Sequence, residues 1–363
     1  MGEKANSCLE RWTGRVRAAA AEKTAIRLRG GGSKDFYGQS LVGELLDTRE
    51  HSGIVAYAPS ELVVTARCGT PLAEMEATLA ENAQSLAFEP PHFDPGATLG
   101  GCVAAGLSGP RRVQAGAVRD FVLGVKMING QGELLNFGGQ VMKNVAGYDV
   151  SRLLAGSLGT LGLIVEVSLK VMPVALAEQT LRFDLDQEKS LNLLNQWGGQ
   201  PLPISASAWA ANSLHVRLSG AAAAVSAATA KLGGQRVTPE ESTAFWLGLR
   251  EQSHPFFAGD APLWRLAVPA TSAVLALPGE QLVEWGGAQR WLRGLGTPAD
   301  QSIRIAAEQS GGHATLFRAD AAQKAALGVF QPLAAPLGRI HHNLKLAFDP
   351  LGVFNLGRLY PDL

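Results

Sequence analysis

The sequence predicts an α+β fold in two domains, and three observations lead to this prediction. Short apolar runs alternate with turn signals up to Pro173, which ends a clean strand pattern over residues 163–171. Beyond Val174 the pattern changes to longer helices and loops, and all of the seven tryptophans except Trp12 lie there. A chain of 363 residues is also long enough for two or three cores. We therefore expect a mixed domain first and a second domain after it.

The first domain is expected to combine short strands with one well-marked helix. Apolar runs predict strands at residues 24–29, 54–57, 62–67 and 86–88. Thr70 as the N-cap and Pro71 at the first helical position predict a helix. Its apolar face would carry Leu72, Met75 and Leu79, which recur at helical spacing.

A hairpin and a long strand complete the predicted first domain. Residues 122–128 and 133–137 read as strands around Asn129-Gly130-Gln131-Gly132, and Asn-Gly favours a tight turn because it accepts positive φ. In the strand at 163–171, Glu166 and Lys170 fall on the face opposite to Val165 and Val167.

The second domain shows helix signals separated by candidate strands. An alanine-rich helix is predicted at 221–232, before Gly233-Gly234, and the capping box Thr238 to Glu241 predicts the start of another. Strands are predicted at residues 214–218, 264–268, 303–307 and 313–318. Trp285 and Trp291 belong either to an exposed partner interface or to the core.

Charge and cysteine content exclude several classes of protein. Lys plus Arg and Asp plus Glu both number 32, so the zero net charge argues against nucleic acid or an anionic membrane as partner. Cys8, Cys68 and Cys102 are an odd number without Cys-x-x-Cys spacing, which favours a reducing compartment and argues against a metal or iron–sulfur site. Charges interrupt the apolar runs, and no export signal is expected at the start of the chain.

Three glycine-rich segments are the main candidates for a binding site. Residues 93–109 contain five glycines, which give a poor helix or strand but let the backbone approach a ligand closely. Residues 27–34 run from a strand into Gly30-Gly31-Gly32-Ser33-Lys34, a potential nest of amides for a pyrophosphate. The third segment is 143–164. Asp35 replaces the third glycine of a dinucleotide fingerprint, and no Gly-Lys dipeptide of a Walker loop occurs. A glycine-rich surface loop remains the alternative for residues 93–109.

Together these segments resemble the FAD-binding domain of the vanillyl-alcohol oxidase and p-cresol methylhydroxylase (PCMH) superfamily, and within it the FAD-binding subunits of glycolate oxidases. The runs at 108–112, 115–124 and 348–358 are similar as well, although Leu356 stands where the family pattern has proline. The resemblance implies a PCMH-type FAD-binding domain of two subdomains at 1–174. It also implies a smaller α+β cap domain at 175–340 and a C-terminal segment, 341–363, that returns to the first domain.

The resemblance also implies which residues bind FAD. The cofactor-binding positions carried over are Arg29, Gly30, Gly31, Gly32, Ser33, Lys34, Pro91, Thr98, Leu99, Gly100, Gly101, Ala104, Gly106, Ser108, Gly109, Gly116, Asp120, Gly147, Gly159, Thr160, Gly162, Ile164 and Asn355. Residues 30–33, 98, 100 and 101 would hold the pyrophosphate. Residues 104–109 would follow the ribityl chain and ring, and 159–164 the adenosine. We expect non-covalent FAD, because Cys102 fits a small buried apolar position better than an attachment site.

The resemblance implies a subunit of a glycolate-oxidising complex, beside a catalytic flavin subunit and an iron–sulfur subunit. Such a complex would lie in the cytoplasm and reach the membrane only through partners. No catalytic residue is assigned, because the seven histidines are scattered and the cap region has no His-x-His pair for a metal. A self-sufficient flavin oxidase of a hydroxy acid or alcohol, and a non-catalytic scaffold subunit, remain alternatives.

Overall fold

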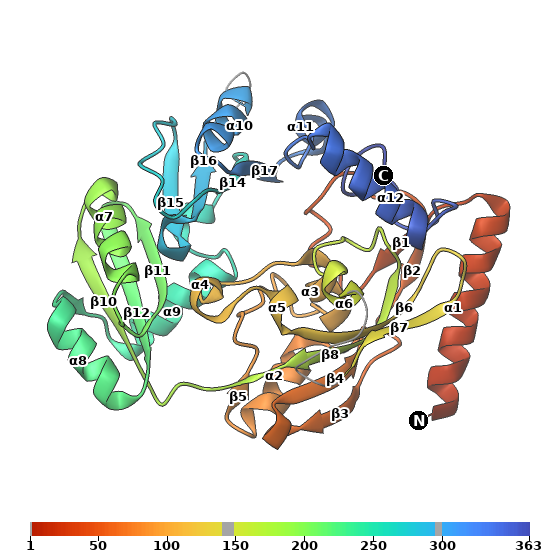
Figure 1. Cartoon of the computed structure of the whole chain (residues 1–363), viewed down its shortest axis with the longest axis horizontal. Coiled ribbons are helices and arrows are strands. Elements are labelled where there is room, and N and C mark those ends of the chain that lie inside the picture. The colour runs from red at the N-terminus through yellow and green to blue at the C-terminus, as the bar shows by residue number, and fades with distance from the viewer. Residues whose placement is uncertain (1, 140–148, 295–299) are drawn as a thin grey trace.

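The computed structural model describes residues 2–139, 149–294 and 300–363, and two β-sheets organise them. A five-stranded sheet has the order β3-β4-β8-β6-β7, and an eight-stranded sheet has the order β13-β10-β12-β11-β15-β16-β14-β17. In Figure 1 the small sheet lies at the lower right and the large one at the upper left. The chain is therefore α+β, as predicted.

The N-terminal part carries the small sheet and two minor pairs of strands. Its helices are α1 (Gly2–Glu22), α2 (Leu72–Ala80), α3 (Leu99–Ala105), α4 (Arg112–Ala115), α5 (Val118–Phe121) and α6 (Val150–Leu153). Its strands are β1 (Ile26–Arg29), β2 (Glu44–Asp47), β3 (Ile54–Ala58), β4 (Val63–Arg67), β5 (Gln84–Ser85), β6 (Val122–Ile128), β7 (Leu134–Gly138), β8 (Leu163–Lys170) and β9 (Met172–Pro173). Strands β1 and β2 pair in parallel, whereas all pairs of the small sheet are antiparallel.

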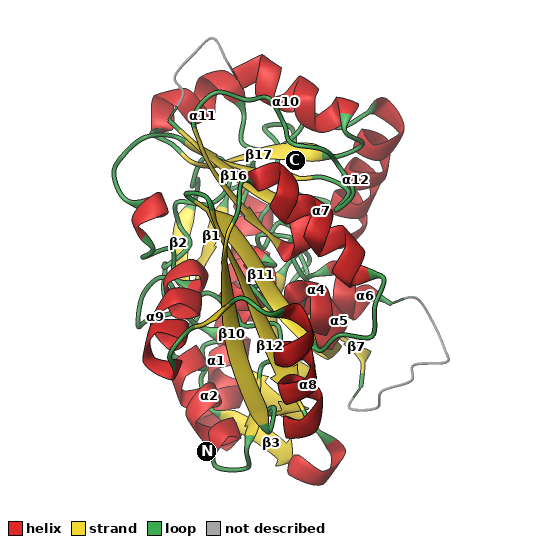
Figure 2. Ribbon diagram, turned by 90° about the vertical axis from the view of Figure 1, so that its left-hand side faces the viewer, coloured by secondary structure: helices red, strands yellow, loops and turns green. Residues whose placement is uncertain are grey.

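The large sheet is antiparallel throughout and belongs to the second part of the chain. Its strands are β10 (Ala177–Asp184), β11 (Ile204–Ala210), β12 (Ser213–Gly220), β13 (Gln235–Arg236), β14 (Leu263–Ala267), β15 (Glu280–Glu284), β16 (Gln289–Arg293) and β17 (His313–Arg318). The helices are α7 (Gln187–Gly198), α8 (Ala222–Leu232), α9 (Pro239–Arg250), α10 (Asp300–Gln309), α11 (Ala321–Leu327) and α12 (Ala335–Phe348). Figures 1 and 2 show α7 and α8 on the outer side of β10–β12, away from the small sheet.

Three local predictions were wrong. Residues 303–307 are helical, in α10, because Ile303 and Ala307 are buried one helical turn apart while Ile305 is exposed. Thr70 does not cap α2: its hydroxyl accepts a hydrogen bond from Gly53 N, and Pro71 takes the N-cap position. The strand expected at 86–88 is instead the two residues of β5 just before it. The hairpin between β6 and β7 and the capping box at Thr238 are confirmed.

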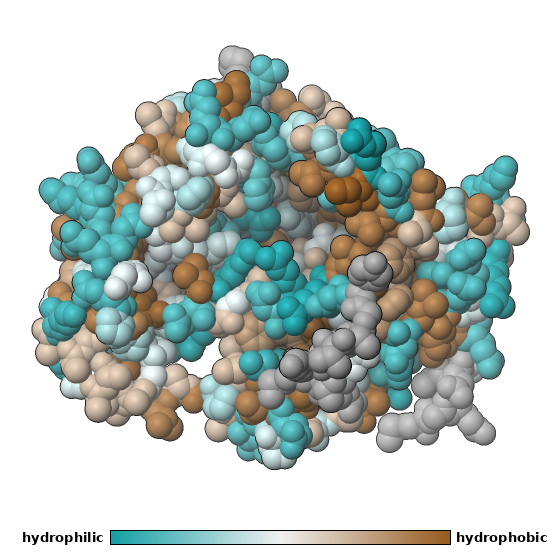
Figure 3. Space-filling model, viewed as in Figure 1, coloured by the Kyte–Doolittle hydropathy of each residue, from teal (hydrophilic) through white to brown (hydrophobic). Residues whose placement is uncertain are grey.

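Buried side chains from both parts of the chain form a shared core between the two sheets. Tyr37 and Leu158 from the first part pack with Trp246, Trp291 and Phe317 from the second. Both Trp285 and Trp291 are buried, so the core alternative holds for them. The exposed large apolar residues include Leu337, Ile340 and Leu346 on α12. Figure 3 shows brown, apolar residues at the upper right, in the region of α11 and α12 in Figure 1.

A charged network also joins the two parts. Arg217 on β12 has only 5% of its side chain exposed, and its guanidinium donates to both carboxylate oxygens of Glu89, at 2.8 and 3.0 Å. Arg111 donates its backbone amide and its side chain to the same carboxylate. The indole of Trp285 donates to the carbonyl of Gly109 at 3.1 Å. Hydrogen bonds and ion pairs are stronger in the buried interior than in water. These contacts therefore hold the large sheet against residues 89–111.

The end of the chain lies against its beginning. Phe354 forms a parallel bridge with Ile26, and the backbone N–H of Asn355 donates to the carbonyl of Ile26. The buried Lys345 ammonium donates to Asp349 Oδ2 at 2.6 Å and to the carbonyls of Thr160 and Phe354. Helix α12 therefore brings the last residues back to β1. The domain limits at 174 and 340 stay predictions, and residue 340 lies inside α12.

His215 on β12 should make the large sheet sensitive to acid. Its ring stacks on Phe245 at 4.0 Å, and burial, with Arg182 nearby, lowers the pKa of His215 from 6.5 to about 4. Between these two pKa values the unfolded chain binds more protons than the folded chain. The contribution of His215 to stability is therefore full above pH 6.5 and is lost as the pH falls from 6.5 to about 4. We expect wild type to lose at most about 3 kcal/mol relative to His215→Phe over this range, measured by denaturant unfolding. Parallel pH profiles of the two proteins would contradict this.

Candidate functional site: a glycine-lined cleft

A narrow cleft joins the three glycine-rich segments that the sequence singles out. Two adjoining pockets share seven lining residues from β1, α3, the 158–164 turn and the C-terminal segment: Leu28, Arg29, Gly30, Gly101, Ala104, Leu158 and Asn355. One pocket continues along Gly100, Gly159, Gly162 and Ile164, and the other along residues 31–34 and Thr98. The separate segments therefore converge, with glycine on several sides.

Four consecutive amides in this cleft have no acceptor within the described residues. The backbone N–H groups of Gly30, Gly31, Gly32 and Ser33 donate no hydrogen bond to a described residue, whereas Asp35, two residues after Ser33, donates to the carbonyl of Gly32. Successive unpaired amides at a turn form a concave site for an anion such as a phosphate. Gly32 has a φ of 78°, which a residue with a side chain rarely adopts.

The positive charge beside these amides comes mainly from Lys34. The Lys34 ammonium forms no ion pair within the described residues, donates to the carbonyl of His92 at 3.3 Å, and has its pKa lowered by burial. Arg29 is different, because its Nε lies 2.9 Å from Asp35 Oδ2, which also pairs with Arg27. Lys34 is therefore the cation available to an anion at this turn, and Arg29 is largely compensated.

The first turn of α3 has its amides already occupied. Leu99 N donates to Thr70 O, Gly100 N to Cys68 O, and Gly101 N to the hydroxyl of Thr98. A Cβ on Gly100 would lie 2.7 Å from Cys68 Cβ, so this glycine allows α3 to pack on the strand end behind it. These residues form a wall of the cleft, while the free amides belong to residues 30–33.

Asn355 connects three parts of the cleft. Its Oδ1 accepts from Leu28 N at 2.8 Å, and its Nδ2 donates to Leu158 O at 2.6 Å. Arg358, also buried, donates to the carbonyls of Asp35 and Gln39 and so holds the loop after the free amides. Burial lowers the pKa of Arg358 to about 10. The end of the chain thus fixes both sides of the cleft.

The remaining predicted site residues lie elsewhere. Pro91, Ser108 and Gly109 line a separate pocket under the large sheet. Thr160 lines a larger cavity of about 860 Å³ between α12 and the large sheet. Leu99 is in the core, Gly106 is the C-cap of α3, Gly116 contacts Asp120, and Asp120 accepts from Ala117 N. Gly147 lies outside the described residues. Thus Leu99, Gly106, Gly116 and Asp120 line none of these pockets.

Sequence reasoning missed several lining residues. Leu28, Thr48, Cys68, Leu158 and Arg358 line the cleft, but their types carry no binding signal by themselves. The signal that could have found Leu28 and Leu158 is their position beside a glycine segment. Arg358 could have been found by its position close to Asn355 near the C-terminus. Cys102 is 1% exposed, and burial raises the pKa of its thiol to about 12. A buried neutral thiol is a poor nucleophile.

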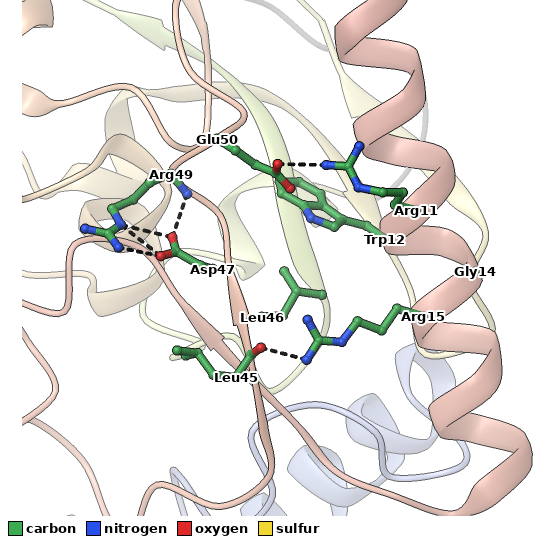
Figure 4. Close-up of a pocket in the computed structure, with 9 residues that line it drawn as sticks. All are labelled: Arg11, Trp12, Gly14, Arg15, Leu45, Leu46, Asp47, Arg49 and Glu50. Carbon is green, nitrogen blue, oxygen red and sulfur yellow. Dashed lines mark hydrogen bonds and ion pairs between the residues drawn. The ribbon is translucent and has the colours of Figure 1, made fainter.

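The open groove between α1 and β2 is not a comparable site. Figure 4 shows its arginines turned toward acidic or carbonyl partners: Arg11 pairs with Glu50, Arg49 with Asp47, and Arg15 donates to the carbonyl of Leu45. Its charges are therefore satisfied within the chain. In the described ranges no group of three or more His, Cys, Asp or Glu side chains is placed to hold a metal. Among the described helices, none has the length and apolar character to cross a bilayer.

Comparison with solved structures and with a family model defines the fold and one of its domains. The chain aligns with p-cresol methylhydroxylase with a TM-score of 0.70 and 15% identity, over 98% of this chain and 87% of that one. An alkyldihydroxyacetonephosphate synthase gives a TM-score of 0.65 over 94% of this chain and 73% of that one, at 15% identity. The model of an FAD binding domain matches residues 13–138. The chain therefore has the PCMH-type fold and contains an FAD-binding domain.

Curated relatives narrow this class to one family. The chain is 48% identical to glycolate oxidase subunit GlcE of Escherichia coli (strain K12) over 96% of both chains. It is 38% identical to glycolate oxidase subunit GlcD of Bacillus subtilis (strain 168), over 23% of this chain and 18% of that protein. A D-lactate dehydrogenase of Anaerostipes hadrus is 35% identical over 36% of this chain and 27% of that protein. The chain belongs to the GlcE family of glycolate oxidase subunits.

Proposed function

We propose that this chain is the FAD-binding subunit of a glycolate oxidase that converts glycolate to glyoxylate. It would act beside a catalytic flavin subunit and an iron–sulfur subunit, in the cytoplasm and in contact with the membrane only through partners. The relatives named GlcE and GlcD support a complex of several subunits. The four acceptor-free amides of residues 30–33 carry the proposal of a bound pyrophosphate.

The cleft fits FAD in composition. Residues 30–33 would hold the pyrophosphate with Lys34, while Gly159, Gly162 and Ile164 would border the adenosine. Ala104, Gly106, Ser108 and Gly109 would lead the ribityl chain and ring toward the large sheet. The two pockets measure only about 70 and 90 Å³, below the roughly 300 Å³ of ordinary ligand sites, so we expect the cleft to widen on binding.

Bound FAD would supply two-electron chemistry and hand electrons on singly to iron–sulfur centres. The protein residues would orient it, exclude water and compensate the charge of its phosphates. We propose that attachment is non-covalent, because the only cysteine among residues 93–109 is the buried Cys102. Flavin that stays with the protein after acid precipitation would contradict this.

The test is the flavin stoichiometry of the purified chain, followed by glycolate turnover. We expect one FAD per chain, negligible turnover by the chain alone, and turnover with an artificial electron acceptor once the partner subunits are added. Turnover by the isolated chain would instead show a self-sufficient oxidase. A colourless chain that refuses added FAD but stabilises its partners would show a scaffold subunit.

A further inference from the structure

A small cavity separates the glycine-rich segment 93–109 from the inner face of the large sheet. Ser108 and Gly109 lie on one side of it, and Arg265, Glu284, Gln289 and Trp291 on the other. Trp285, next to Glu284 in the chain, donates its indole N–H to Gly109 O. The end of β15 therefore sits directly against the backbone that is proposed to follow the flavin ring.

Glu284 is an unusual residue for this position. It is 4% exposed, and Oε2 accepts both N–H groups that reach it, from Trp291 Nε1 at 2.6 Å and from Gln289 Nε2 at 3.0 Å. In the described part of the chain no donor reaches Oε1, and Glu284 forms no ion pair. A buried carboxyl group with one oxygen doubly occupied and the other without a donor is well suited to carry a proton on the second oxygen.

The charged neighbours do not compensate Glu284. On β14, Arg265 donates to the hydroxyl of Tyr37, and on α4 Arg112 stacks over the Trp285 ring at 4.4 Å. On α9, Arg250 pairs with Glu251 at 2.7 Å. Glu89 is occupied by Arg217, and its negative charge opposes ionisation of Glu284. Burial is the main cause that raises the pKa of Glu284 from 4.5 to about 7, and the nearby Glu89 adds to it.

We propose that Glu284 is a proton-binding partner of the flavin, taking up a proton when the flavin is reduced and releasing it when the flavin is reoxidised. This inference rests on the proposed function. Two electrons delivered with one proton, as a hydride equivalent from the hydroxy acid, would leave one negative charge on a bound flavin ring. That charge opposes ionisation of the nearby carboxylate, so Glu284 takes a second proton from solvent. When the two electrons leave for an iron–sulfur acceptor, both protons return to solvent.

The test is the midpoint potential of the bound flavin as a function of pH, titrated with dithionite. One additional proton per two electrons steepens the slope by about 30 mV per pH unit, and we expect this extra slope in wild type above pH 7. Glu284→Gln keeps the shape of the side chain but cannot ionise, so the extra slope should vanish. Glu280→Gln is the matched control, because Glu280 begins the same strand and its side chain is 68% exposed. Equal slopes in wild type and Glu284→Gln would overturn the inference.

A second measurement separates this inference from the proposed function. Infrared titration of the flavin-free chain should show a buried carboxyl group that loses its proton near pH 7 and is missing in Glu284→Gln. If neither wild type nor the two variants bind FAD, the proposed function fails, and the flavin-linked role of Glu284 fails with it. If FAD binds but wild-type protein shows no carboxyl group titrating near neutral pH, only the role of Glu284 is overturned. The infrared result on wild type needs no variant to fold.

Discussion

Gly31→Ala is expected to weaken FAD binding strongly while both sheets remain folded. A Cβ at this position would lie 1.7 Å from the carbonyl oxygen of Gly96 and 2.4 Å from its carbon. Backbone atoms cannot rotate away as a side chain can, so the loop must shift. Its acceptor-free N–H groups then no longer point toward the same phosphate. We expect affinity for FAD to fall at least about 100-fold, roughly 3 kcal/mol of binding free energy. Flavin content and fluorescence titration would measure it.

Gly14→Ala is the matched control for this substitution. Gly14 lies in α1, and a Cβ there meets nothing within 4 Å. Alanine should even stabilise that helix by about 1 kcal/mol and leave flavin content unchanged. Circular dichroism should show native secondary structure in both variants. Full flavin content in Gly31→Ala would refute the assignment of the pyrophosphate to residues 30–33.

Lys345→Met is expected to cause the largest loss of stability. The substitution leaves Asp349 Oδ2 without its ammonium partner in a site where Asp349 is 1% exposed, and it removes the link to Thr160 O and Phe354 O. Breaking a buried ion pair from one side costs about 3–5 kcal/mol. Denaturant unfolding would measure the change in free energy. FAD affinity should fall as well, because Asn355 follows directly on Phe354 and closes the cleft.

The control is Lys189→Met on α7, where Lys189 pairs with Asp186 but its side chain is 70% exposed. Exposed pairs contribute about 0–1 kcal/mol, so this variant should unfold nearly as wild type does. A similar small effect for Lys345→Met would mean that contacts other than this ion pair anchor the C-terminal segment.

Local patterns predicted most elements of the small sheet and failed where a short apolar run fits two structures. Residues 303–307 show the difficulty, because an apolar run of this length suits a buried strand or one face of a helix. Ile303 and Ala307 are both buried on one face, which is compatible with a helix. This buried face exists only because the helix packs against the folded sheet. Thr70 likewise has the residue type of an N-cap, but its hydroxyl is taken by Gly53 from a neighbouring loop.

The sequence by itself determined the class of fold and the three glycine-rich segments, because glycine content, turn signals and alternating strands are local properties. The return of the C-terminal residues was implied only by the resemblance to a known family. The tertiary structure alone decided that the free amides lie at residues 30–33, that Thr160 faces another cavity, and that Glu284 lies beside Ser108 and Gly109. These depend on pairings between residues more than 100 positions apart, such as Asn355 with Leu28 and Trp285 with Gly109. No local pattern encodes such a contact, since it exists only when both sheets have formed and packed together.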